Sequence, residues 1–188
     1  MKKVFIVIAA VCLCAFQAKA QENTLPKGSN VVGLSIGIGN TLYSGVSGSG
    51  VKKMPAISAQ YERGVIGNLW NSQSSLGIGG LVGYTQAKWN SGLGYGWRDS
   101  RFIIGVRGAV HYTFVNRLDT YAGVLIGYDV VSSKMTGNWG GLNYKASSSS
   151  VAFNGFLGAR YYFSSQWAAF AELGWGLAVL NIGVAYKF

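Results

Sequence analysis

Few residues in this sequence could carry out chemistry. His111 is the only histidine, and the two cysteines, Cys12 and Cys14, both fall within the first twenty residues. No second histidine, cysteine or carboxylate stands at ligand spacing from His111, so we predict no metal site. A chain without its first twenty residues would have no cysteine for a disulfide, a zinc site or a nucleophile. We therefore expect no catalytic residue and no enzyme.

A glycine-rich stretch at 77–83 superficially resembles a dinucleotide-binding fingerprint. Its glycine spacing is off by one, and neither a helical pattern nor a βαβ unit surrounds it. We interpret these glycines as part of a strand and predict no bound cofactor.

The amino-terminal residues 1–20 have the pattern of a secretory signal peptide. Lys2 and Lys3 precede an apolar stretch, and Ala18-Lys19-Ala20 forms a small-x-small cleavage site before Gln21. No later stretch approaches the roughly 18 apolar residues of a transmembrane helix. An integral membrane protein with this sequence would therefore have to span the membrane with strands.

After a short polar leader at 21–29, the chain alternates between apolar and small or polar residues with period two. This alternation is typical of strands with one apolar face. We count eight such runs, at 30–44, 54–64, 75–89, 101–115, 119–134, 151–163, 167–175 and 179–188. The intervening segments, including 90–100 and the serine-rich 135–150, are expected to be loops.

The last run carries the most specific signal. Its apolar positions end at a terminal aromatic residue and are Leu180, Ile182, Val184, Tyr186 and Phe188. This run resembles the terminal strand of small bacterial outer-membrane β-barrel proteins. The resemblance implies an all-β fold, an eight-stranded antiparallel up-and-down transmembrane β-barrel over 30–188, integral to the outer membrane. It also implies that the five residues are an assembly signal read by the barrel-assembly machinery.

Connection lengths and aromatic residues orient such a barrel. The connections after the first, third and fifth runs are long, whereas those after the fourth and sixth are short, which suits longer surface loops and short periplasmic turns. Aromatic residues fall near both ends of the runs, as expected for two girdles at the membrane interfaces. The link after the second run is long for a periplasmic turn, and the last surface loop is short.

Charged residues on the inner face would be buried in a narrow barrel and must pair. The period-two pattern places six residues there: Glu62, Arg107, Asp129, Arg160, Glu172 and Lys187. A packed polar core is the favoured interpretation of this set, and a gated pore or proton path is the alternative. Some small barrels are enzymes on lipid A, but His111 lies toward the periplasmic end and has no nearby serine.

Basic residues dominate the expected surface loops and their borders. Removal of Lys2, Lys3 and Lys19 from the 16 basic residues leaves 13 against 6 acidic residues. Seven of these basic residues are candidates for contact with lipopolysaccharide phosphates: Lys52, Lys53, Lys88, Arg98, Arg101, Lys134 and Lys145. Sugar or nucleic acid would be alternative ligands, but anionic lipid is the commoner partner of an exported basic chain, so we predict no nucleic-acid partner.

The expected function is structural, adhesive or partner-binding, through the basic surface loops and in contact with outer-membrane lipid. A narrow porin, or an accessory subunit bound to another outer-membrane protein, is the alternative. A lipid-modifying enzyme is a third, less favoured, interpretation.

Overall fold

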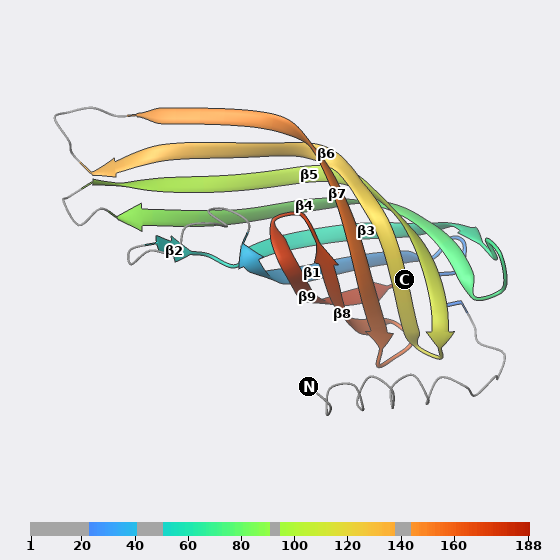
Figure 1. Cartoon of the computed structure of the whole chain (residues 1–188). Coiled ribbons are helices and arrows are strands. Elements are labelled where there is room, and N and C mark those ends of the chain that lie inside the picture. Colours follow the sequence, from blue (N-terminus) through green and yellow to red (C-terminus); the bar gives the residue numbers. More distant parts are fainter. Residues whose placement is uncertain (1–22, 41–50, 91–94, 138–143) are drawn as a thin grey trace, which may run out of the picture.

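The computed structural model describes residues 23–40, 51–90, 95–137 and 144–188 of the chain (Figure 1). Residues 1–20, interpreted above as a signal peptide, lie outside these ranges. The described residues form nine strands: β1 (Asn30–Asn40), β2 (Val51–Lys53), β3 (Ala56–Gly67), β4 (Ser74–Asn90), β5 (Tyr95–Val115), β6 (Leu118–Gly137), β7 (Lys145–Tyr162), β8 (Trp167–Gly174) and β9 (Ala178–Lys187). No helix among them is long and apolar enough to span a membrane.

Eight of these strands close into an antiparallel up-and-down barrel. Each of β3 to β9 pairs with its neighbour in sequence, and β1 pairs with both β3 and β9 to close the ring. The short β2 lies outside the ring order and extends the β3 side of β4. Because closure leaves no free edge within the ring, the backbone groups of the wall are satisfied by neighbouring strands.

Alternating side chains give the wall an apolar outer face and a small or polar inner face. In β1, the side chains of Leu34 and Ile36 are 64% and 57% exposed, whereas Ser35 between them is 8% exposed. The hydroxyl of Ser35 lies 2.7 Å from that of Ser58 on β3, inside the barrel. The strands therefore form with the period and the phase that the sequence predicts.

The strand register fixes the tilt of the wall. Following directly paired residues from Ile57 across β4, β5 and β6 leads to Ser149 on β7. Following them in the other direction, across β1, β9 and β8, leads to Ala159 on the same strand. The two paths arrive ten residues apart, which for eight strands corresponds to a tilt of about 40°.

The two sides of the barrel differ greatly in height. β5 and β6 contain 21 and 20 residues, whereas β8 contains 8. The distal halves of β4 to β7, with β2 at one margin, therefore project beyond the β8–β9 hairpin as an open sheet (Figure 1). We call this part the protruding sheet, the end where it lies the tip end, and the opposite end, with the short turns, the turn end.

The protruding sheet corrects two loop predictions. Residues 95–100 belong to β5, and the serine-rich stretch at 145–150 belongs to β7. Both were expected to be loops because their side chains do not alternate between apolar and polar. In the protruding sheet, beyond the part of the wall with an apolar outer face, neither face needs to be hydrophobic. Cross-strand pairing maintains the strands there, although the sequence does not alternate with period two.

Glycines on the inner face leave room for large side chains in the lumen. A Cβ atom on Gly158 would lie 2.4 Å from Cζ of Tyr121, and one on Gly123 would lie 2.5 Å from Cζ of Phe156. These glycines are tolerated in strands because aromatic rings from neighbouring strands occupy the space next to them. The glycines on the inner face therefore make room for aromatic side chains that fill the lumen, and they do not leave it open.

Residues 23–29, the described part of the leader, close the turn end of the barrel. Leu25 is fully buried in a cluster that includes Val31, Tyr162 and Phe170. The amide of Thr24 donates to Oγ1 of Thr113 at 3.2 Å, and the carbonyl of Thr24 accepts from Nζ of Lys187 at 3.3 Å. The polar leader predicted from the sequence is thus a plug held by specific contacts.

Candidate functional site

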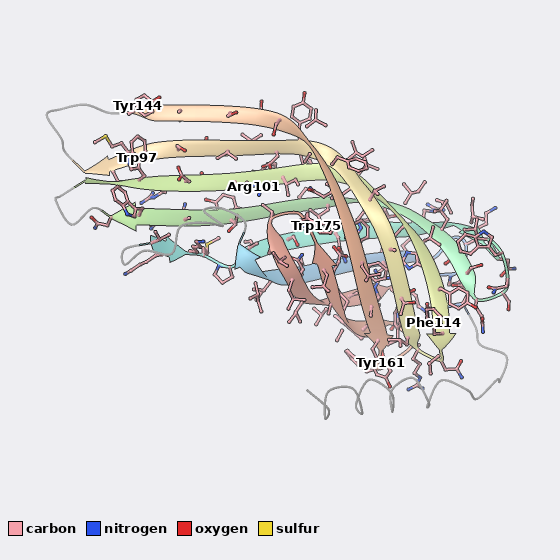
Figure 2. All side chains as sticks on the ribbon, viewed as in Figure 1. Trp97, Arg101, Phe114, Tyr144, Tyr161 and Trp175 are labelled. Carbon is pink, nitrogen blue, oxygen red and sulfur yellow. The ribbon has the colours of Figure 1, made fainter. Side chains whose placement is uncertain are left out.

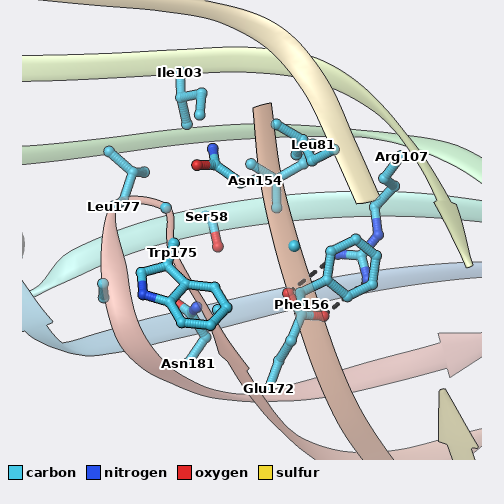
Figure 3. Close-up of a pocket in the computed structure, with 15 residues that line it drawn as sticks. Ser58, Leu81, Ile103, Arg107, Asn154, Phe156, Glu172, Trp175, Leu177 and Asn181 are labelled. Atoms are coloured by element: carbon cyan, nitrogen blue, oxygen red, sulfur yellow. Dashed lines mark hydrogen bonds and ion pairs between the residues drawn. The ribbon is translucent and has the colours of Figure 1, made fainter. Parts of the chain in front are cut away.

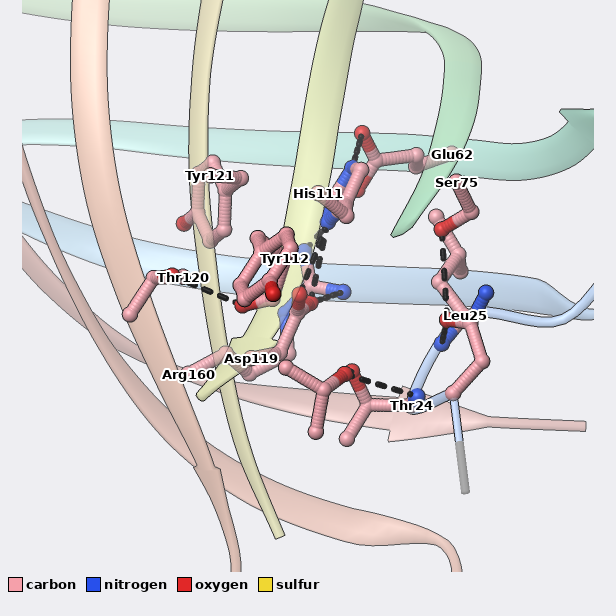
Figure 4. Close-up of polar contacts among 12 residues, drawn as sticks. Thr24, Leu25, Glu62, Ser75, His111, Tyr112, Asp119, Thr120, Tyr121 and Arg160 are labelled. Atoms are coloured by element: carbon pink, nitrogen blue, oxygen red, sulfur yellow. Dashed lines mark hydrogen bonds and ion pairs between the residues drawn. The ribbon is translucent and has the colours of Figure 1, made fainter. Parts of the chain in front are cut away.

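The lumen near the turn end is filled by a buried ionic cluster around His111 (Figure 4). Nδ1 of His111 lies 3.0 Å from both carboxylate oxygens of Asp119, and Nε2 lies 3.0 Å from Oε1 of Glu62. Arg160 donates from Nη2 to Oε2 of Glu62 at 2.9 Å and lies 3.5 Å from Asp119. All four side chains are at most 3% exposed.

This arrangement determines the hydrogen atoms on His111. Each ring nitrogen faces a carboxylate, so when both carboxylates are ionised and can only accept hydrogen bonds, both nitrogens donate. The resulting imidazolium and Arg160 balance the charges of Glu62 and Asp119. The two carboxylates lie on opposite sides of the imidazole, so the three groups do not converge on one point that could hold a metal ion. Among the described residues, no cluster suited to binding a metal is found.

A second ionic layer fills the lumen closer to the tip end (Figure 3). Arg107 donates from Nη2 to Oε2 of Glu172 at 2.8 Å and also bonds to Gln60. Its guanidinium carbon lies 4.0 Å from the ring centre of Phe156. The hydroxyl of Tyr121 donates to the same Glu172 oxygen at 3.2 Å, and the Tyr121 ring centroid lies 5.2 Å from that of His111, so Tyr121 connects the two layers.

Little open space remains above this layer. A cavity of about 40 Å³ lies between Arg107, Phe156 and the β8–β9 hairpin, whose Leu177 is only 6% exposed. In the part of the chain that the structure describes, the lumen is therefore a packed polar core with an apolar cap.

The six predicted lumen residues do not form one network. Glu62 and Arg160 belong to the His111 cluster, and Arg107 and Glu172 form the second layer. Asp129 pairs with Arg101 at the base of the protruding sheet. Lys187 lies at the turn end, with its Nζ 4.6 Å from the ring centre of Tyr162.

Sequence reasoning missed Asp119, His111 and Tyr121 as members of the lumen core. Asp119 and Tyr121 have the same parity as Asp129 on β6, so extending the period-two pattern by ten residues would have placed both inside. His111 has the same parity as Arg107 on β5, so the period-two pattern also places it inside, but its two carboxylate partners come from β3 and β6 and depend on the register.

The basic residues at the tip end form a row across five strands. Register pairs join them in the order Lys52, Lys88, Arg98, Lys134 and Lys145. All five are exposed, and they lie on the outer face, in phase with the apolar side chains lower on the same strands. We call this row the basic ladder.

The ladder places like charges directly opposite one another. Neighbouring strands are about 4.8 Å apart, so the ladder extends over about 19 Å. Directly opposed like charges destabilise a sheet unless counter-charges are supplied. Asp99, the acidic residue nearest to the ladder in sequence, lies on the inner face of β5 and is 6% exposed. The ladder is therefore suited to binding an extended or multiply charged anion.

The two remaining phosphate-contact candidates lie on the other face. Lys53 pairs in register with Ala87, which is fully buried on the inner side. Arg101 forms hydrogen bonds from Nε to both oxygens of Asp129, at 2.9 and 2.8 Å. The structure thus brings five of the seven candidates together and separates Lys53 and Arg101 from them.

Aromatic side chains mark both ends of the molecule (Figure 2). Phe114 and Tyr161 lie near the turn end and are 56% and 52% exposed. At the tip end, the rings of Trp97 and Tyr144 meet edge to face with centroids 5.7 Å apart. The aromatic side chains expected to form the girdle at this end are others, namely Tyr84, Trp89, Tyr128 and Trp175, and of these Tyr128 and Trp175 are 57% and 79% exposed.

No protein-family model and no curated protein matches this sequence. Solved structures do match its fold. A designed transmembrane β-barrel is 19% identical, with a TM-score of 0.51, over 86% of this chain and 97% of the other. Ail, the attachment invasion locus protein of Yersinia pestis, solved with the heparin analogue sucrose octasulfate, is 13% identical, with a TM-score of 0.50, over 86% and 99%. The outer membrane protein OprG of Pseudomonas aeruginosa is 11% identical, with a TM-score of 0.43, over 89% and 99%.

The similarities to the designed barrel and to Ail, with TM-scores of 0.51 and 0.50, agree with the eight-stranded antiparallel β-barrel described above. OprG, and Ail in a further structure, are described as outer membrane proteins. At these identities the likeness extends to the fold and not to a particular activity.

Proposed function

We propose that this chain is a non-enzymatic integral β-barrel of the bacterial outer membrane whose basic ladder binds the phosphate groups of lipopolysaccharide. The turn end then faces the periplasm and the tip end faces outward. The observation that carries the proposal is the alignment of five basic residues in one register row on the lipid-facing side of the wall.

The order of rows on the outer face supports this assignment. Of the three rows compared, the one nearest the turn end is apolar and consists of the exposed residues Val82, Ile104, Tyr128 and Val151. Between this apolar region and the ladder lies a neutral polar row of Gln86, Ser100, Ser132 and Ser147. The sequence of apolar, polar and cationic rows follows that of acyl chains, interface and phosphates in a membrane leaflet.

The lumen disfavours the alternative functions. A porin needs a continuous water path, whereas the Arg107 and Arg160 layers and the Leu25 plug occupy the barrel interior. A lipid-modifying enzyme needs an accessible catalytic group, whereas His111 is fully buried between two carboxylates. We therefore keep the structural or adhesive role as the proposed function. The barrel-assembly machinery is the partner proposed for assembly.

A sulfated glycan is the second candidate ligand for the same ladder. The Ail structure, which has a similar fold, was solved with sucrose octasulfate, a polyanion. Sulfate and phosphate groups would both be recognised by charge-assisted hydrogen bonds from lysine and arginine. The two ligands are distinguished by competition.

The test compares two triple variants of equal charge change. Lys88→Gln with Arg98→Gln and Lys134→Gln removes the centre of the ladder, and Lys27→Gln with Arg63→Gln and Arg117→Asn removes three exposed charges at the turn end. Each basic residue near an anionic surface contributes about 1 kcal/mol. We therefore expect the ladder variant to bind lipopolysaccharide at least about tenfold more weakly at low salt, and the control variant to bind like the parent.

Salt and competition complete the test. The difference between the two variants should shrink at high salt, because exposed charges are screened within about 8 to 10 Å at physiological ionic strength. Equal lipopolysaccharide binding by both variants at low salt would refute the lipid assignment. Displacement of lipopolysaccharide by micromolar sucrose octasulfate would favour the sulfated glycan.

A further inference from the structure

The distal half of β7 has an open edge. Pairing between β7 and β8 ends at Phe156 and Gly174, and one further hydrogen bond joins the amide of Trp175 to the carbonyl of Gly155 at 3.3 Å. Between Lys145 and Asn154, β7 pairs with β6 alone among the described residues. Figure 1 shows this part of β7 at the margin of the protruding sheet.

The hydrogen-bond phase identifies which backbone groups face the open side. The amide of Met135 donates to the carbonyl of Tyr144 at 3.0 Å, and because Met135 follows and Tyr144 precedes the paired residues Lys134 and Lys145, the two are directly opposed. In an antiparallel pair, hydrogen-bonded and non-hydrogen-bonded positions alternate. Even-numbered residues of β7 therefore bond to β6, and odd-numbered residues turn their N–H and C=O groups to the open side, in agreement with the outward carbonyl of Gly155. These residues are Lys145, Ser147, Ser149, Val151 and Phe153.

The two margins of the protruding sheet differ in their protection. The opposite margin, β2, carries Lys52 and Lys53 and is followed by Pro55, and charges and proline are the usual means of blocking an edge. Residues 146–154 of β7 include no charged residue and no proline, and the β6–β7 register contains no bulge. The sequence thus blocks one margin and leaves the other able to pair.

We propose that the open edge of β7 binds an extended segment of a partner protein as an added antiparallel strand. Main-chain hydrogen bonds to the five odd-numbered residues would supply the affinity. In this direction the carboxyl-terminal end of the segment lies beside Lys145, where Lys134 is also directly paired, so acidic residues are favoured there. Apolar residues are favoured at the other end, beside Val151 and Phe153, which are 68% and 69% exposed.

A second copy of this chain does not fit the edge as well. Two copies in one membrane share an orientation, so their β7 strands would run in the same direction. Parallel pairing in register would then place Lys145 next to its counterpart, which is destabilising. An acidic segment of another protein avoids this repulsion. The inference goes beyond lipid binding because it uses the backbone edge and not the outer face of the ladder.

The experiment uses the full mature protein in detergent, without lipopolysaccharide. The probe is a fluorescent peptide of about ten residues that alternates valine and threonine and ends in two glutamates. Ser149→Pro removes one N–H from the open edge and leaves the bonds to β6 intact, since proline is tolerated at edge positions that face away from the ladder. Ser149→Ala is the matched control, because it changes the side chain and keeps the N–H.

We expect the proline variant to bind the peptide at least about tenfold more weakly than the parent, because the lost bond also leaves a peptide carbonyl unpaired. The alanine variant should bind within about twofold. Faster gel migration of unboiled protein would verify that each variant is folded. If the proline variant does not fold, a peptide with N-methyl groups on alternate amides tests the same bonds on the parent protein and should bind as weakly.

Three results would overturn the proposal: no binding of the acidic peptide to the parent, equal binding by the proline and parent proteins, or equal binding of the N-methylated peptide. Equal affinity for a peptide that ends in two lysines would overturn the assignment of an acidic partner. A ladder double variant, Lys88→Gln with Arg98→Gln, keeps Lys134, Lys145 and the whole edge, so it should still bind the peptide, and failure of the lipid proposal can be recognised separately.

Discussion

Nη2 of Arg160 lies 2.9 Å from Oε2 of Glu62, across the lumen and 98 residues away in the sequence. Both side chains are buried, so each charge depends on the other for compensation. Arg160→Met should lower the free energy of unfolding by about 3 to 5 kcal/mol, because it leaves Glu62 and Asp119 with one cation fewer. Urea unfolding in lipid vesicles would measure the change. Arg63→Met, at the exposed neighbour of Glu62, should change it by less than about 0.5 kcal/mol. Similar losses for both variants would contradict the importance of the buried cluster.

The barrel should not conduct ions. The Arg107 and Arg160 layers fill the lumen, and Leu25 closes its turn end. Planar-bilayer recordings of the pure protein should therefore be silent, and they should remain silent for Thr24→Ala with Leu25→Ala, because two sealed layers persist. Stable single-channel steps of uniform size from the parent would instead support the porin interpretation.

Leu25 should stabilise the barrel although it precedes the first strand. It is fully buried, and replacing a buried leucine with alanine costs about 2 to 5 kcal/mol. Leu25→Ala should therefore lower the unfolding midpoint measurably in lipid vesicles. The control is Lys27→Ala, at an exposed position of the same leader. If the two substitutions were equivalent, the leader would not be a packed plug under these conditions.

Phe188 should matter more for assembly than its neighbour. Its side chain is 60% exposed on the outer face, beside the ring of Tyr186 at 6.2 Å, whereas Lys187 points inward to Thr24. Phe188→Asp, or deletion of Phe188, should reduce the amount of folded protein in outer-membrane fractions far more than Lys187→Asp. Equal amounts for all variants would argue against the terminal strand as an assembly signal.

The ring of strands could be predicted because a membrane-facing wall imposes strict alternation. Leu34 and Ser35, or Val106 and Arg107, reveal their faces by residue type alone. The same alternation placed Glu62 and Arg160 in the lumen. It could not reveal that they meet, because partners across the lumen depend on how far the strands are staggered around the ring.

The alignment of the basic ladder could not be predicted from the sequence for a related reason. Lys88, Arg98 and Lys134 were recognised as basic residues near surface loops, but only the register shows that they are directly opposed. Serine-rich strand ends such as 145–150 carry no apolar period, so their strand character could not be recognised from hydrophobicity. Arg101 was misplaced with the surface charges because one position along a strand separates the two faces.

The period of two that aligns the ladder also constrains how this protein can change its length over evolution. Insertion of one residue into β6 before Lys134 would bring Ser133 to the ladder position and turn every residue beyond the insertion to the opposite face. Insertion of two residues would preserve the faces and move the charged row by one step. Related barrels should therefore vary in strand length by even numbers, with odd changes confined to the connections, and a one-residue difference within β4 to β7 would mark a lineage in which the ladder has been lost or rebuilt.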